Sequence, residues 1–97
     1  MSAGTLIRKR LVFRGAVQGV GFRWRARIAA DAAGATGWVR NNYDGSVTME
    51  LQGTEAQLDM VVQSLDRARY IRIDTLEARR IPVDPEERDF ITKDDLW

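Results

Sequence analysis

The sequence predicts an α+β fold, the ferredoxin-like sandwich, in which a four-stranded antiparallel sheet carries two helices on one face. Segments with strand-like and helix-like spacing of apolar residues follow one another in the order β-α-β-β-α-β, and a short strand-like segment ends the chain. Two split βαβ units of this kind interlock into one sheet, and the right-handed crossover rule leaves few alternatives. The length of 97 residues is that of one domain with a modest core. We therefore expect residues 1–97 to form a single domain.

The first strand and the first helix are predicted over residues 6–15 and 22–33. Residues 6–15 alternate at first and then become continuously apolar through Val12 and Phe13, which indicates a strand partly buried on both faces. In residues 22–33 the apolar side chains recur with helical spacing and form one face. That face consists of Phe22, Ala26, Ala29, Ala30 and Ala33. Gly34 is a natural C-cap for this helix.

The middle of the chain predicts a hairpin and a second helix. A strand opens at Trp38, Asp44-Gly45 is a turn signal, and residues 47–53 alternate between apolar and polar side chains. Thr54 and Gln57 have the spacing of a capping box, and apolar residues at helical spacing follow them, so a helix is expected over residues 54–68.

The last part of the chain predicts one long and one short strand. Residues 70–81 form the fourth strand, residues 82–85 with their two prolines form a loop, and residues 89–92 form a short final strand.

The composition excludes several classes of site, because the chain has no cysteine and no histidine. Disulfides, zinc sites built from these residues, and Ser–His–Asp or Cys–His catalysis are excluded. An enzyme of this composition would use a reaction that needs little acid–base help from the protein. The N-terminus lacks the pattern of a signal peptide, and no apolar run approaches the ~18 residues that cross a membrane. We expect a cytoplasmic protein without a membrane partner.

The charge is unevenly distributed along the chain. Residues 1–42 contain eight Lys and Arg residues and one acid, whereas residues 43–97 contain seven Lys and Arg residues and thirteen acids. A basic half indicates an anionic partner, either a small phosphorylated molecule or a nucleic acid. Alternatively, the fold interleaves the two halves and their charges neutralise each other. Charge alone does not decide between these interpretations.

A glycine-rich stretch, Gly15-Ala-Val-Gln-Gly-Val-Gly-Phe-Arg23, lies between the first strand and the first helix. The first amides of a helix have no intrahelical partner, and glycines allow such N–H groups to converge on an anion. The helix dipole and the guanidinium of Arg23 would strengthen anion binding. The stretch fits neither GxxxxGK[ST] nor GxGxxG. From spacing alone, a tight strand-to-helix turn is the commoner use of such glycines.

Three spaced segments give the chain a strong resemblance to the acylphosphatase family. The first is the glycine-rich stretch, which matches GxVQGVxFR. The second is Gly34-Ala-Thr-Gly-Trp-Val-Arg-Asn41, which matches GxxGxVxN, and the third is Asp44-Gly45-Ser-Val, which matches DGxV. The resemblance covers about residues 11–65, without a gap. It implies the hydrolysis of acyl phosphates to carboxylate and orthophosphate, by a protein without metal or cofactor.

The resemblance also implies which residues form the site. Arg23 would close the loop on the phosphoryl group, and Asn41 would hold the attacking water. The loop backbone would bind the phosphoryl group through Gly15, Ala16, Val17, Gln18, Gly19, Val20, Gly21 and Phe22. This chemistry suits the composition, because a carboxylate leaving group with a pKa near ~4 needs no general acid.

Other residues near these motifs are interpreted as structural. The side chain of Gln18 is expected to brace the loop, and Asn42 to serve the hairpin, because neighbouring strand residues face opposite sides of a sheet. Arg25 and Arg27 could steer anions to the site, but they are interpreted as a solvated helix face. Core or loop anchors are expected at Val20, Phe22 and Trp38, and exposed strand positions at Ser46 and Thr48.

The chain departs from the family pattern in two places. Residues 68–80 lack the proline- and glycine-bearing link that commonly precedes the fourth strand, and the chain continues past Ile91. Asp94, Asp95 and the terminal carboxylate could pair with the arginines of the site.

Two alternative functions stay open at this point. One is a non-catalytic RNA- or polyanion-binding module of the same fold, which sheet-face aromatics would favour. The other is an acylphosphatase-like domain that binds carbamoyl phosphate within a larger maturation enzyme. The strands contain few aromatic residues and no RNP1-like pattern, so we expect no nucleic-acid partner. We expect a monomer whose partner is a small-molecule acyl phosphate.

Overall fold

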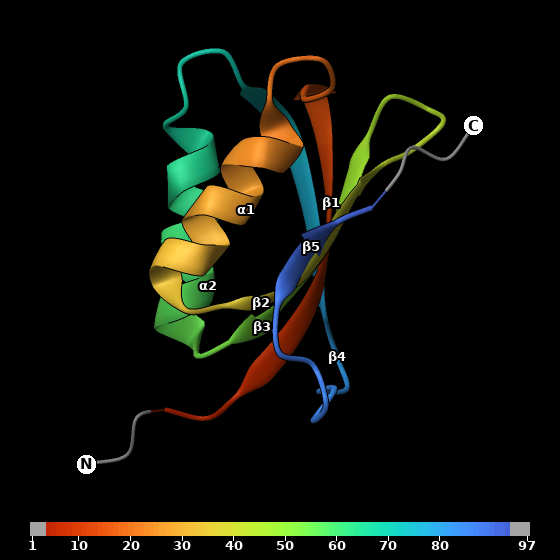
Figure 1. Cartoon of the computed structure of the whole chain (residues 1–97). Helices are drawn as coiled ribbons and strands as arrows, with labels where there is room; N and C mark the ends of the chain where they lie inside the picture. The colour runs from red at the N-terminus through yellow and green to blue at the C-terminus, as the bar shows by residue number, and fades with distance from the viewer. Residues whose placement is uncertain (1–3, 94–97) are drawn as a thin grey trace.

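The helices and strands follow the predicted order in the computed structural model, which describes residues 4–93 (Figure 1). Asp94 and Asp95 lie outside the described residues, and so does their expected pairing with the site arginines. The elements are β1 (Ile7–Ala16), α1 (Phe22–Ala33), β2 (Thr36–Asn41), β3 (Val47–Gly53), α2 (Glu55–Asp66), β4 (Arg72–Ile81) and β5 (Phe90–Thr92).

The strands form one mixed sheet in the order β4-β1-β3-β2-β5. The pairs among β1 to β4 are antiparallel, whereas β5 runs parallel to β2 at one edge. Both helices cover the same face of the sheet, and β4 forms the other edge (Figure 1). The predicted ferredoxin-like α+β fold is confirmed, and the short final strand extends its sheet.

Several element boundaries differ from the prediction, among them the start of β2 and the end of α2. β2 begins at Thr36 rather than at Trp38, and it includes Gly37 with φ of +141°. A Cβ at Gly37 would lie 1.9 Å from the carbonyl oxygen of Glu50 on β3, so this glycine permits close strand pairing instead of a turn. At the other helix, Thr54 and Gln57 form the predicted capping box, but α2 already ends at Asp66.

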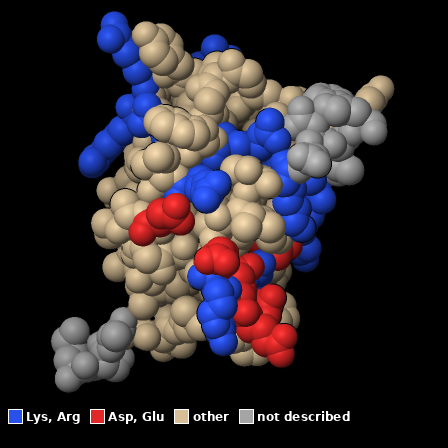
Figure 2. All heavy atoms as spheres, in the orientation of Figure 1, with Lys and Arg blue, Asp and Glu red and all other residues tan. Residues whose placement is uncertain are grey.

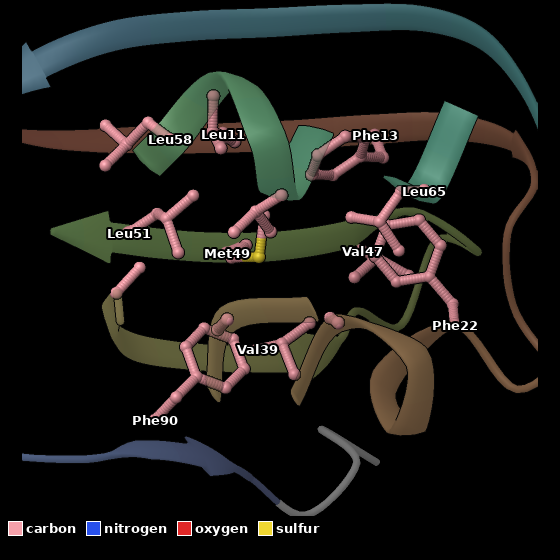
Figure 3. Packing of buried hydrophobic residues seen from close by; sticks show 14 of the residues in the cluster. Leu11, Phe13, Phe22, Val39, Val47, Met49, Leu51, Leu58, Leu65 and Phe90 are labelled. Carbon is pink, nitrogen blue, oxygen red and sulfur yellow. The ribbon is translucent and has the colours of Figure 1, made fainter. Parts of the chain in front are cut away.

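The core lies between the sheet and the two helices, as Figure 3 shows. Alternate residues of the strands point into it and meet the buried faces of α1 and α2. Phe13 on β1 and Phe22 at the start of α1 pack edge to face with ring centroids 5.0 Å apart. This contact fixes the beginning of α1 against the end of β1 and therefore positions the loop between them.

The face of the sheet away from the helices contains a buried ion-pair cluster. The guanidinium of Arg8, whose side chain is only 6% exposed, donates hydrogen bonds to Glu50, Gln52 and Glu87. The prediction that the first strand is partly buried on both faces is confirmed. Glu87 belongs to the segment between β4 and β5, so the cluster holds this segment against the sheet.

Ion pairs along β1 join the two halves of the sequence. Arg8, Lys9, Arg10 and Arg14 pair with acids that come from β3 onward or from the turn before it. The interleaving of charges therefore accounts for the basic residues of β1. Within residues 4–93, no helix has the length and apolar character needed to span a membrane.

Candidate active site

The strand β1 reaches further into the glycine-rich stretch than expected. Gly15, the last residue of the predicted strand and the first of the predicted loop, pairs with Ile73 of β4, and Ala16, predicted in the loop alone, pairs with Arg72. At Gly15 φ is +133°, and a Cβ would lie 2.3 Å from the carbonyl oxygen of Arg72, so glycine is required by the approach of β4. Only residues 17–21 lie between the strand and α1, whose first residues are Phe22 and Arg23.

Gly19 and Gly21 give this loop its turn toward the helix. Both adopt left-handed backbone angles, with φ of +73° and +77°, and open space lies over each of them. Gly21 is the N-cap of α1, where no side chain caps the helix and the first turn contains no acid. The first amides of α1 and the positive end of its dipole therefore favour an anion at the loop.

The side chain of Gln18 fastens the loop to the β2–β3 hairpin. Its amide nitrogen donates hydrogen bonds to the carbonyl oxygens of Asn42 and Ser46, at 2.7 and 2.8 Å. The interpretation of this side chain as a brace is confirmed. The bonds fix the loop relative to the end of β2, where Asn41 lies.

Asn41 and Arg23 meet the loop in one pocket of about 200 Å³. Asn41 is 8% exposed and is the last residue of β2, on the helix-covered side that also holds Val39. The sequence places Arg23 and Asn41 in different elements, and the fold brings both to the same hollow. Its lining comprises Val17, Gly19, Gly21, Phe22, Arg23, Trp24 and Asn41.

The guanidinium of Arg23 contacts the residue that follows β5. Its Nη1 donates a hydrogen bond of 2.8 Å to the carbonyl oxygen of Lys93, 70 residues further along the chain. A guanidinium has five N–H donors in a fixed fork, and this bond helps to orient the group. Sequence reasoning missed the contact with Lys93, because no local pattern indicates which helix the short strand lies beside.

Asn42 faces away from Asn41 and supports the hairpin, as predicted. Its side-chain amide donates to the hydroxyls of Ser46 and Thr48, at 3.0 and 2.6 Å. The prediction that Ser46 and Thr48 are exposed is wrong, since each is 3% exposed. The side chain of Asn42 and the turn cover these hydroxyls, which a polar position in an alternating pattern does not reveal.

The turn of the hairpin contains a strongly stabilised carboxylate. The hydroxyl and the backbone N–H of Ser46 and the guanidinium of Arg14 donate hydrogen bonds to Asp44, and together they lower the pKa of its carboxyl to about 2. The ionised form of Asp44 therefore supports the hairpin that carries Asn41 and anchors Gln18.

The lowered pKa of Asp44 predicts how the hairpin responds to acid. Because the pKa falls from 3.8 to about 2 on folding, ionised Asp44 stabilises the fold above pH 3.8, and this contribution disappears as the pH falls through about 2. A carboxyl-carbon NMR titration should place the midpoint of Asp44 near pH 2. The difference in stability between wild type and Asp44→Asn should be constant from pH 5 to 7 and should decrease as the pH falls from about 4 through about 2. A midpoint near 3.8 would show that these bonds do not persist in solution.

A comparison of the sequence with models of protein families identifies the family of this chain. The family model described as acylphosphatase matches residues 9–92. The chain belongs to the acylphosphatase family. The resemblance drawn from the three spaced motifs is thus confirmed, and it extends over β4 and β5.

Individual proteins give the same result. An acylphosphatase from Pediococcus pentosaceus is 40% identical over 81 residues, which are 81% of this chain and 89% of the relative. The crystal structure of acylphosphatase from Bacillus subtilis matches with a TM-score of 0.82 at 26% identity, covering 90% of this chain and 98% of that one. The acylphosphatase-family fold also occurs within T. kodakarensis HypF, with a TM-score of 0.74 at 30% identity, where it covers 90% of this chain and 12% of the larger one.

Proposed function

We propose that this chain hydrolyses acyl phosphates to a carboxylate and orthophosphate, with the loop amides and Arg23 holding the phosphoryl group and Asn41 orienting the water. The observation that carries the proposal is the pocket in which the glycine loop, Arg23 and Asn41 meet. Membership of the acylphosphatase family supports the reaction, and the geometry supports the roles of the individual residues.

The loop and Arg23 supply what phosphoryl transfer requires most, which is positioning and stabilisation of charge. Amides at the start of α1 donate to the phosphoryl oxygens at the positive end of the helix dipole, and open space over Gly19 and Gly21 admits the group. The guanidinium of Arg23 adds charge-assisted hydrogen bonds as negative charge develops in the transition state. Gln18 acts through the loop, whose position it holds.

Asn41 supplies the orientation of the nucleophile. Its side-chain amide accepts a hydrogen bond from the water, whose oxygen attacks phosphorus while the bond between phosphorus and the acyl oxygen breaks. The carboxylate leaves with the bonding electron pair, and the phosphate oxygens take up the protons of the water. Because the carboxylate is stable at neutral pH, no protein group has to protonate it.

The sheet face away from the helices argues against the alternative of RNA binding. Its aromatic residue Trp38 has cations over the ring from Lys93, Arg40 and Arg10, at 4.2, 5.0 and 5.8 Å from the ring centroid. A base would have to displace these groups before it could stack on the ring of Trp38.

We also propose that the protein is a cytoplasmic monomer that acts on a small molecule, with no nucleic acid or membrane partner.

The test of the proposed function is the release of phosphate from benzoyl phosphate in the presence of EDTA. We expect turnover well above that of buffer alone, without added metal. A rate equal to that of buffer would reject the proposal. Retention of RNA at moderate salt, together with a lack of turnover, would support the binding module instead.

A further inference from the structure

A second hollow opens beside the proposed phosphate pocket. It has a volume of about 280 Å³ and lies between α1 and the end of β5. The two hollows share Arg23 and Trp24, so they meet along the first turn of α1. Among the described residues the second hollow is lined by Arg23, Trp24, Arg27, Thr92 and Lys93.

This region is the basic part of the face shown in Figure 2. Lys and Arg side chains gather there around the start of α1 and the end of β5, whereas most Asp and Glu side chains of this face lie toward its lower end. A phosphoryl group bound by the loop and Arg23 would have its acyl group beside it. The second hollow adjoins that position and would receive the acyl group.

We propose that this second hollow is an acyl-group subsite that selects acyl phosphates whose acyl group carries its own carboxylate. The inference rests on the proposed function, because it assumes that the phosphoryl group occupies the first pocket. The residue that would bind the additional carboxylate is Arg27.

The position of Arg27 suits this task. It follows Arg23 by four residues on α1, so its side chain emerges on the same side of the helix, about 6 Å further along the axis. Its side chain is 60% exposed, and its nitrogen Nε lies 3.9 Å from the carboxylate of Asp31. Exposed pairs of this kind contribute little, so a substrate carboxylate can compete with Asp31 for the guanidinium.

The other lining residues define the rest of the subsite. Trp24 is 65% exposed and borders both hollows, so its indole offers an apolar wall for the methylene groups of an acyl chain. The ammonium of Lys93 lies over the ring of Trp38, 4.2 Å from the centroid, so we do not assign the substrate carboxylate to Lys93. An acyl group with two methylene groups between its carbonyl and a terminal carboxylate has a length comparable to the rise of about 6 Å along the helix axis between residues four apart, such as Arg23 and Arg27.

The test compares two substrates of equal chain length, succinyl phosphate and butanoyl phosphate. We expect wild type to have a higher kcat/KM for succinyl phosphate. Arg27→Gln should lower that value about fivefold, the size expected for an exposed ionic contact, and change the value for butanoyl phosphate less than twofold. The variant is expected to fold normally, because the side chain lies on the exposed face of α1.

Arg25→Gln is the matched control, because it removes the same charge from the same helix. Arg25 lines a different hollow, together with residues of α2. It should leave the ratio of the two substrates within twofold of wild type. Equal losses in Arg25→Gln and Arg27→Gln would mean that general electrostatic attraction causes the preference, and this would overturn the subsite.

The remaining outcomes separate this inference from the proposed function. If wild type hydrolyses both substrates with equal kcat/KM, the subsite is overturned while the proposed function stands. If wild type hydrolyses neither substrate, the proposed function fails, and the subsite fails with it.

Discussion

Replacement of Arg23 by alanine is expected to lower the turnover of benzoyl phosphate at least about 100-fold, which is the usual effect of losing a group that stabilises transition-state charge. Arg23 lines the pocket together with the glycine loop, and its guanidinium donates a hydrogen bond to the carbonyl oxygen of Lys93. Alanine removes both the charge and the fork of donors. Arg23→Lys restores the charge without the fork, so we expect it to recover only part of the activity.

The measurement should separate binding from folding. Inhibition by inorganic phosphate should weaken strongly in Arg23→Ala, because the same group holds the phosphoryl oxygens. Circular dichroism and thermal unfolding should show a folded protein, since the bond to Lys93 lies at the surface. Arg25→Ala, with its side chain on the exposed part of the same helix, is the control and should retain activity. Turnover of Arg23→Ala within about threefold of wild type would contradict the proposed role.

Replacement of Asn41 by alanine should also lower kcat about 100-fold, but by a different route. Asn41 is proposed to orient the water and not to bind the phosphoryl group, so inhibition by inorganic phosphate should change little. A comparable loss of phosphate inhibition in Asn41→Ala would assign this residue to phosphate binding instead. Kinetics and inhibition measured on the two variants side by side therefore distinguish the two roles.

Asn42→Ala is the matched control for Asn41→Ala, because the two residues are neighbours of the same type that face opposite ways. The side chain of Asn42 donates to Ser46 and Thr48, so its removal should cost about 1 to 2 kcal/mol of stability. Its kcat should stay within about fivefold of wild type below the unfolding transition. Loss of kcat equal to that of Asn41→Ala would mean that the hairpin as a whole, not the Asn41 amide, governs the reaction.

The fold was predictable because its elements have clear local signals. The helical spacing in α1, the alternation in β3 and the capping box at Thr54 each specify an element by themselves. The glycines were harder to interpret. Gly15 and Gly37 serve close contacts with neighbouring strands, whereas Gly19 and Gly21 provide left-handed turns, and a sequence pattern does not distinguish these two uses.

The candidate site was predictable in part. Arg23 and Asn41 were identified through spaced motifs, and the fold brings them together. The contribution of Lys93 arises from a contact across 70 residues that no local pattern contains. Ser46 and Thr48 were misjudged for a related reason, because alternation predicts the face on which a side chain lies and not whether another side chain covers it.

The composition of β4 has a consequence for how copies of this chain meet one another. As an edge strand of ten residues, β4 presents a row of backbone groups that could pair with the same strand of another molecule. Its side chains are mostly exposed, and half of them are charged, namely Arg72, Asp74, Glu77, Arg79 and Arg80. Pairing a strand of another molecule with β4 would bring the charged side chains of both strands close together and remove part of their hydration. The edge is thereby protected against the cross-molecule sheet extension that begins aggregation.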